Sequence, residues 1–388
     1  MSKIGYDERS LAAEAGLSPT AIRKILNGET KRLRDLTLNK LANALRTEPS
    51  ALTGTANTHT VDETHLEEVD LEAAYGPSVH SALRLGGRRT LWLQYDTASE
   101  ERYDPTTTIA RVVPDEPVLP PGFVKIRSEI ERQNERFKLD RSLGKPYFDG
   151  PSFCLKRYSI ERTDDGNERK TVSWEVSRSR YANNKTAKSG AAANLRRKAL
   201  KSFEFLDQPI EWLSIGLGVS LVVYTKDRKS FIAARRSDNE QFRRREWDIS
   251  VVEGINPVKD TRAADANLVY IYDAARRAVQ AELGFSVSEG QIKIVGFGVD
   301  LEYYQWNFVG YVDSGLTYQE VESYWAMADE KEETIRLKEV PNEPLAAATF
   351  LRENLIWSCG MATLFISTIK SAEDQESTRS SLKSALQV

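Results

Sequence analysis

The segment between residues 216 and 234 restricts the fold more strongly than any other part of the chain. Two apolar runs, Val219–Tyr224 and Ser230–Ala234, flank the polar stretch Lys226–Lys229. Short apolar runs that are rich in β-branched and aromatic residues, and that meet at a polar turn, are typical of paired strands. The sequence therefore predicts two strands joined by this turn.

A helical pattern follows these strands. Across Asn267–Leu283, apolar residues at 268, 271, 272, 275, 279 and 283 form a stripe that can dock on a sheet. The polar residues 371–388 are expected to be a disordered tail. Two further strands and then two further helices are predicted between these segments, at Ile292–Val299, Trp306–Val312, Tyr318–Met327 and Asn354–Lys370.

Residues 78–205 are predicted to form an α+β lobe that precedes this region. Thr90–Tyr95 has the composition of a strand, and Phe123–Leu139 has the apolar spacing of an amphipathic surface helix. Phe153–Glu161 and Thr171–Ser177 flank an Asp-Asp-Gly-Asn sequence at 164–167, which is typical of a hairpin turn.

Residues 8–27 have the pattern of a helix-turn-helix. Gly16 permits the positive φ of a tight turn, and Leu17 can fill the space between two helices. Ser18 is a favourable N-cap, and Pro19 occupies the first position of the second helix. The apolar residues of the two helices are spaced to face each other: Leu11, Ala12, Ala15, Ile22, Ile25 and Leu26.

This arrangement resembles the Cro/C1-type (XRE) family of repressor domains over roughly residues 6–54, within a predicted domain 1–54. In that family the second helix enters the major groove, which implies double-stranded DNA as a partner and a homodimer on paired half-sites. Residues 1–50 contain nine Lys/Arg and six Asp/Glu, a local charge of +3. The alternative is a small helical bundle with a solvated charged face. The predicted DNA contacts are Ser18, Thr20, Arg23, Lys24, Asn27, Lys31, Arg32 and Arg34.

Charge and cysteine content limit where DNA contacts can lie and in which compartment the protein works. Residues 55–77 carry six acidic side chains and no Lys or Arg, which predicts an acidic linker. The 388 residues have a net charge of −3, so any DNA contact must come from a local patch. Cys154 and Cys359 form no CxxC motif, and the longest apolar run, Ile215–Tyr224, is too short to cross a membrane. We therefore expect a cytoplasmic protein without membrane contact.

Two segments are similar to the halves of the Nudix box, whose pattern is Gly-x5-Glu-x7-Arg-Glu-U-x-Glu-Glu-x-Gly-U with U an aliphatic residue. They are Trp247–Gly254 and Arg277–Phe285, and a long insertion separates them. Ala278 and Ala281 stand where the family has two Glu, and Asp260 is the only acid at the Gly-x5-Glu position. The residues that match the second half are Arg277, Glu282, Gly284 and Phe285.

The order of lobe, box and later strands resembles the UDP-sugar-pyrophosphatase-like branch of Nudix proteins. The resemblance implies an α/β/α sandwich over residues 206–370 and a nucleotide or nucleotide-sugar-like ligand. Carboxylates on a helix hold Mg²⁺ in that family, and here Glu282 is the one strong ligand of three that remains, a weak metal site. The implied ligand contacts are Tyr181, Arg235, Arg236 and Trp247, and the residual catalytic candidates are Glu253, Asp260 and Glu282.

Three functions fit these features. The first is a DNA-binding regulator whose catalytically degenerate Nudix domain senses a nucleotide-like ligand. The second is an active Mg²⁺-dependent pyrophosphohydrolase with an accessory DNA-binding domain, and the third is an adaptor that only binds other proteins. The absence of Glu at Ala278 and Ala281 favours the first, with no catalytic residue and no cofactor other than Mg²⁺ as a candidate. Glutamates at both positions would then be expected to raise Mg²⁺ binding.

Overall fold

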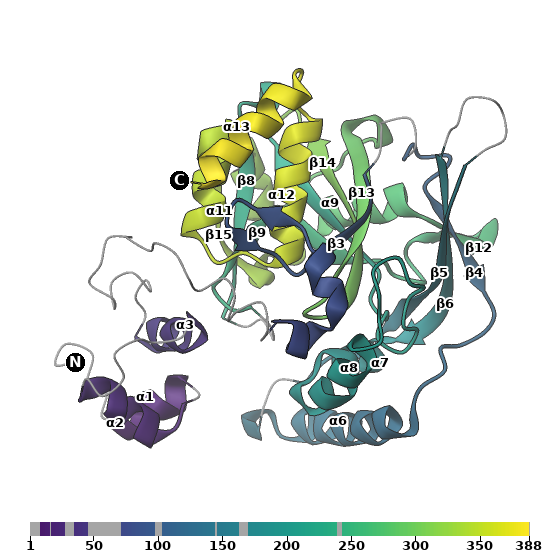
Figure 1. The fold of residues 1–388 in the computed structure, drawn as a ribbon. Coiled ribbons are helices and arrows are strands. Elements are labelled where there is room, and N and C mark those ends of the chain that lie inside the picture. The colour runs from purple at the N-terminus through teal and green to yellow at the C-terminus, as the bar shows by residue number, and fades with distance from the viewer. Residues whose placement is uncertain are drawn as a thin grey trace. The chain divides into compact units, whose positions relative to one another are not determined.

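The protein consists of two compact units, residues 1–65 and 66–388 (Figure 1). The computed structural model describes residues 8–15, 17–27, 35–45, 71–97, 103–143, 146–162, 170–238 and 243–387.

The first unit contains three short helices, α1 (Glu8–Ala15), α2 (Pro19–Leu26) and α3 (Asp35–Ala44). The Ser18 Oγ accepts a hydrogen bond of 3.1 Å from the backbone N–H of Ala21, which confirms the predicted N-cap of α2. Leu26, predicted to be buried, is 44% exposed because it lies at the last position of α2. The core of the unit is a small apolar cluster of Leu11, Ala12, Ala15, Ile22, Leu41 and Ala44.

A mixed eight-stranded sheet forms the centre of the second unit (Figure 1). β7 and β14 pair in parallel, and the other neighbours in this sheet pair antiparallel. β10 (Val251–Gly254) pairs with β7, and β9 (Trp247–Ile249) pairs with β8. The remaining strand order is β15 (Thr334–Pro341), β8 (Ser230–Arg236), β7 (Gly218–Tyr224), β14 (Gln305–Asp313), β13 (Ile292–Asp300) and β3 (Trp92–Thr97).

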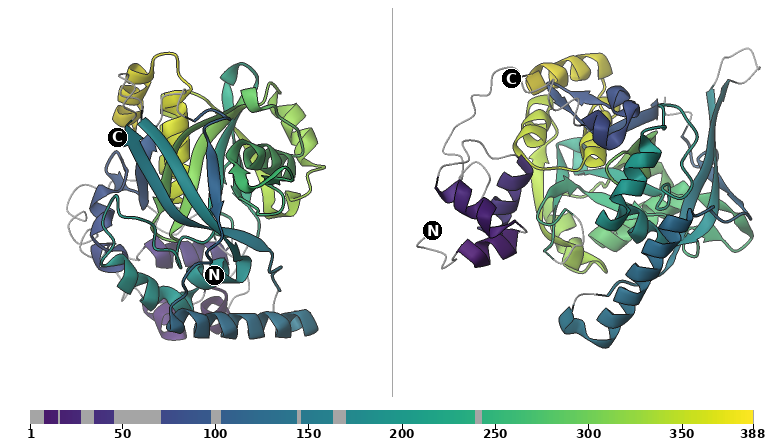
Figure 2. Two further views of the ribbon diagram at one scale, coloured as in Figure 1. Left: turned by 90° about the vertical axis from the view of Figure 1, so that its right-hand side faces the viewer. Right: turned by 60° about the horizontal axis from the view of Figure 1, so that its bottom comes forward.

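Helices cover both faces of this sheet, which gives an α/β/α arrangement (Figure 2). Along β7, Val219, Leu221 and Val223 pack in the same apolar cluster as α9 (Ile271–Leu283). The alternating residues Val222 and Tyr224 pack in a second cluster with α12 (Ser358–Lys370). Side chains alternate between the faces of a strand, so a fully apolar strand requires a covering layer on each side. The predicted hairpin at 216–234 is confirmed as β7 and β8.

A second sheet lies beside the first in the order β11 (Thr261–Arg262), β12 (Asp265–Tyr270), β4 (Ile109–Val113), β6 (Lys170–Arg180) and β5 (Pro151–Arg162). The helix predicted from residue 267 is wrong over its first residues, since 265–270 form β12 and pair with β4. The insertion between the two box segments therefore adds strands to the sheet of the preceding lobe. Trp174 of β6 packs on Phe308 of the large sheet, with ring centroids 4.9 Å apart.

The remaining elements surround the two sheets. Leu71 and Tyr75, at the end of the segment predicted as a linker, belong to a helical turn at 71–75 and pack against the main core. The other helices and strands are η1 (Pro77–Ser81), β1 (Arg84–Leu85), β2 (Arg88–Arg89), α6 (Pro121–Leu139), η2 (Arg141–Leu143), α7 (Tyr181–Lys188), η3 (Gly190–Ala192), α8 (Ala193–Leu200), η4 (Lys226–Arg228), η5 (Glu289–Gln291), α10 (Tyr318–Trp325), η6 (Lys331–Glu333), α11 (Pro344–Glu353) and α13 (Gln375–Gln387).

The prediction of a disordered tail is wrong for residues 375–387, which form α13. This helix packs against α11 and α12 through Leu382 and Leu386, which are 0% and 7% exposed. The two leucines are four residues apart and lie on one helix face, so the Ser-rich composition hid an amphipathic pattern. Gly86, with φ +62, lies so close to the Leu386 carbonyl that a Cβ would meet it at 2.2 Å.

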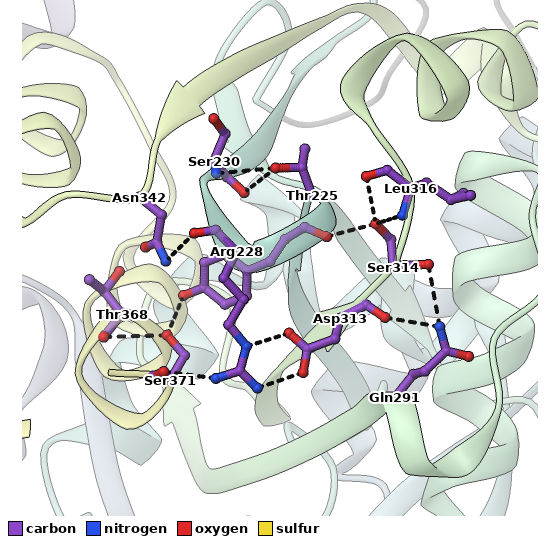
Figure 3. Close-up of polar contacts among 11 residues, drawn as sticks. Thr225, Arg228, Ser230, Gln291, Asp313, Ser314, Leu316, Asn342, Thr368 and Ser371 are labelled. Atoms are coloured by element: carbon purple, nitrogen blue, oxygen red, sulfur yellow. Dashed lines mark hydrogen bonds and ion pairs between the residues drawn. The ribbon is translucent and has the colours of Figure 1, made fainter. Parts of the chain in front are cut away.

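Arg228 joins three elements at one end of the large sheet (Figure 3). Its Nε and Nη2 atoms donate to the two carboxylate oxygens of Asp313, each at 2.6 Å. Its Nη1 donates to the carbonyl of Ser371 at 2.8 Å, and its own carbonyl accepts from Asn342 at 3.0 Å. A planar guanidinium can meet several acceptors at once, so Arg228 fixes the β7–β8 turn to β14 and to the end of α12.

Candidate functional site

The second helix of the first unit presents polar side chains at its surface. Ser18, Thr20, Arg23, Lys24 and Asn27 are all exposed. These are five of the eight predicted DNA contacts, and the other three, Lys31, Arg32 and Arg34, lie outside the described residues. The Ser18 oxygen also caps α2, so this side chain has a structural role in addition to any contact with DNA.

The large unit contains a cavity of about 310 Å³ with a largely polar lining. Tyr181 and Arg236, two of the four predicted ligand residues, line this cavity. Arg235 and Trp247 do not; instead the Arg235 guanidinium lies 5.8 Å from the centre of the Trp247 ring. Successive residues of a strand point to opposite faces, so Arg235 and Arg236 of β8 cannot both face one cavity. The other lining residues are Pro151, Ser152, Asn184, Lys188, Gly216, Arg243, Val252, Glu253, Gly254, Ile255, Asn256, Tyr303, Gln305, Glu333 and Trp357.

Three cationic side chains, Lys188, Arg236 and Arg243, line the cavity together. The Lys188 Nζ donates to the Gln305 Oε1 at 2.6 Å. Two contacts fix the position of Arg243. Its Nη1 lies 2.6 Å from the Asp248 Oδ2, and its guanidinium stacks 4.3 Å from the centre of the Trp357 ring. Buried, hydrogen-bonded charges of this kind keep a fixed geometry.

Burial alters the protonation of groups around this cavity. Burial, together with the positive charges of Arg243 and Arg236, lowers the pKa of Lys188 to about 7, while Asp300 opposes the change. Burial also raises the pKa values of Glu246 and Asp300 to about 7. Neither acid lines the cavity, so the lining carries the cations while several of the neighbouring acids lie outside it.

Arg277 binds two of the predicted catalytic acids, Glu253 and Asp260. Its guanidinium donates to the Asp260 carboxylate at 2.7 and 2.9 Å, to the Glu253 Oε1 at 2.9 Å and to the Gly254 carbonyl at 2.7 Å. Asp260 is 1% exposed, and its Oδ2 also accepts from the backbone N–H of Asn256. Two of the three predicted catalytic candidates are thus paired with one arginine.

Glu282, the third candidate, has a backbone partner. Its Oε1 accepts from the N–H of Val252 at 3.0 Å, and burial raises its pKa well above the usual value, as does the nearby charge of Glu253. Among the residues that the structure describes, no group of three or more His, Cys, Asp or Glu side chains is placed to hold a metal. This arrangement does not fit the predicted Mg²⁺ ligand set, because Mg²⁺ requires several free oxygen ligands.

Ala278, one of the two positions where the Nudix family has Glu, is 0% exposed and packs in the main core. A glutamate there would place a carboxylate among apolar side chains. This burial argues against the expectation that a glutamate at Ala278 would raise Mg²⁺ binding, and calorimetry of Ala278→Glu tests it. Ala281 is only partly buried.

A sequence pattern could have identified some of the cavity-lining residues that were not predicted. Tyr181, Asn184 and Lys188 lie at spacings of three and four residues on α7, so they share one helix face. Once Tyr181 is assigned to a ligand site, this spacing also selects Lys188. Arg243, Tyr303 and Trp357 come from separate loops and helix ends, and no local pattern connects them.

Comparison with known proteins supports one of the two resemblances. Residues 3–52 match a helix-turn-helix family, in agreement with the Cro/C1-type pattern, and this match does not extend into the large unit. No curated protein matches the chain. In the described part of the chain, no helix combines the length and apolar character needed to cross a membrane. The match, together with the exposed polar face of α2, supports a role for this protein as a DNA-binding regulator.

Proposed function

We propose that this protein is a transcriptional regulator that binds DNA through α2 and senses a nucleotide-like ligand in the cavity of its large unit. The helix-turn-helix match over residues 3–52 carries this proposal. The exposed side chains of α2 supply what groove recognition requires: Arg23 and Lys24 for guanine edges or phosphates, and Asn27 for adenine. A homodimer on two half-sites is part of the proposal, and light scattering tests it.

The DNA-binding part is tested by retardation of the protein's own promoter DNA at fixed salt. Arg23→Ala should cost roughly 1–3 kcal/mol of specific binding, which is about 5-fold to 150-fold in Kd. Arg132→Ala is the matched control, since this arginine is also exposed but lies on α6 of the large unit. Wild-type retardation by the Arg23→Ala/Lys24→Ala protein would refute a recognition role for α2.

The ligand part rests on the cavity. Lys188, Arg236 and Arg243 suit an anionic ligand, while Tyr181 offers aromatic surface for a base or sugar. A ligand controls DNA binding only if it binds two states of the protein unequally. We therefore expect a nucleotide-sugar such as UDP-glucose to raise the melting temperature and to change operator affinity, without being hydrolysed.

One observation keeps the pyrophosphohydrolase as a second candidate: Glu253 lines the cavity next to Gly254. Incubation with UDP-sugars, NAD or ADP-ribose and Mg²⁺, followed by chromatography of the products, separates the two functions. Turnover by the native protein that Glu282→Gln abolishes would establish the enzyme and refute the sensor.

A further inference from the structure

Lys188 is an unusual cation for a cavity wall. In the part of the chain that the structure describes, no carboxylate lies within ion-pair distance of its Nζ, and its hydrogen bond goes to the neutral amide of Gln305 at 2.6 Å. A buried ammonium with a neutral partner is poorly stabilised, because its desolvation is not offset by an opposite charge.

The residues that line the cavity do not supply the negative charge that would offset the Lys188 ammonium. Arg236 of β8 and Arg243 of the loop before β9 line the same cavity, and both repel an ammonium. Asp300, at the end of β13, attracts it but does not line the cavity, and Glu302 and Glu246 are further acids outside the lining. Two acids do line it: Glu253 is engaged by Arg277, and Glu333 is not among the charges that shift the pKa of Lys188.

We propose that Lys188 is the anion-binding residue of this cavity and that an anionic ligand group, a phosphate of the nucleotide-like ligand, is bound there together with one proton. The proposal rests on the proposed function for the identity of the ligand, but the anion site itself stands on the geometry of the three cations. The phosphate would lie between Lys188 and Arg243, whose position Asp248 and Trp357 already fix.

The uptake of a proton follows from the change in charge around Lys188 when the anion binds. Without ligand, burial and the two arginines lower the pKa of Lys188 to about 7, so the amine is largely neutral at pH 8. A bound phosphate provides the missing negative charge, and the ammonium form becomes the stable one in the complex. Binding above pH 7 therefore includes the uptake of one proton, and binding below pH 6 does not.

The proton uptake gives a definite pH dependence. The fraction of free protein with a charged Lys188 falls from roughly three-quarters at pH 6.5 to about 3% at pH 8.5. The affinity for the ligand should therefore decrease about 25-fold over this range, since only the charged form binds. UDP-glucose is a suitable probe because its diphosphate carries the same charge throughout this range.

Isothermal titration calorimetry of the full chain with UDP-glucose, in two buffers of different ionisation enthalpy, measures the proton uptake directly. Wild type should take up nearly one proton at pH 8.5 and show the decrease in affinity. Lys188→Arg, which is charged at both pH values, should bind without proton uptake and with little pH dependence. Lys188→Met should bind at least 10-fold more weakly than wild type at pH 6.5. Lys185→Met, one helical turn away and outside the lining, is the matched control and should behave as wild type.

Wild-type affinity in Lys188→Met, or pH-independent binding to wild type without proton uptake, would overturn the proposal. If UDP-glucose does not bind at all, sulfate replaces it as a minimal anion in a thermal-shift assay against chloride at equal ionic strength. Stabilisation of wild type but not of Lys188→Met then supports the anion site and refutes only the nucleotide-sugar ligand, whereas equal responses refute the site. If the calorimetric results hold but operator affinity is unchanged by UDP-glucose, the regulator proposal fails and the site stands.

Discussion

Replacing Arg277 by Met should destabilise the large unit by about 3 kcal/mol. The Arg277 side chain is 18% exposed, and its partners Asp260 and Glu253 are 0% and 24% exposed. Removing one partner from a buried ion pair costs about 3–5 kcal/mol, because the remaining charge is left without compensation. Partial exposure of Glu253 allows water to replace part of its lost contact, so the lower end of that range applies here.

Arg262→Met is the matched control. Arg262 lies on β11 and, like Arg277, forms an ion pair that involves α9. Arg262 also pairs with a carboxylate, Asp273 of α9, but their side chains are 49% and 24% exposed. An exposed pair of this kind contributes about 0–1 kcal/mol. The two substitutions remove the same charge and the same donors, and each arginine lies near two carboxylates, so the difference between them reflects mainly the burial of the partners.

Urea denaturation followed by tryptophan fluorescence provides the measurement. All seven tryptophans lie at residue 92 or beyond, so the signal reports the large unit alone. A double-mutant cycle with Asp260→Asn should give a coupling energy of about 2 kcal/mol between the two side chains. If Arg277→Met loses no more stability than Arg262→Met, the buried network of Arg277 does not hold the box-like segments together.

Three further predictions concern single side chains. Leu382→Ala should cost about 2–4 kcal/mol in the same assay because Leu382 is 0% exposed, whereas Lys383→Ala, one position along α13, should have almost no effect. Ala278→Glu should lower the melting temperature strongly without any gain in Mg²⁺ binding by calorimetry, and exposed Gln280→Glu should not; a stable protein that binds Mg²⁺ would contradict the buried placement of Ala278. Asp300→Asn should raise the free energy of unfolding at pH 8.5 by on the order of 1–3 kcal/mol and by less than half as much at pH 5, since burial raises the pKa of this acid to about 7 and the loss of stability develops as pH rises from the pKa of the unfolded chain, about 4, to that value. Equal effects at both pH values would refute this assignment.

Local sequence patterns predicted the helices and strands whose structure is determined mainly by their own residues. The hairpin of β7 and β8, the helix α6 and the cap of α2 all follow from apolar spacing and turn chemistry. β12 was predicted as helix because Leu268 and Ile271 fit a helical stripe, and its pairing with β4, far away in sequence, decided otherwise.

The site was harder to predict than the fold. Of the four residues predicted to contact a ligand, Tyr181 and Arg236 line the cavity, whereas Arg235 and Trp247 do not. Residues such as Arg243 and Trp357 come together only through tertiary packing, and no spacing rule reaches across such distances. Arg277 binds both Glu253 and Asp260, so neither acid is free to act as a metal ligand. Residue types alone do not predict this pairing.

The pairing of β3 with β13 has a consequence for how the protein folds. Thr97 of β3 lies opposite Gly296 of β13, so this edge of the large sheet closes only when segments about two hundred residues apart in the chain meet. Long-range strand pairing is slow, because the entropy of closing a long loop is lost before the contacts form. The contacts of α1, α2 and α3 are all local by comparison, and such helical units form quickly. Refolding should therefore pass through a state in which the helix-turn-helix is complete while the edge of β13 is still unpaired, and that open edge is where we expect self-association to begin.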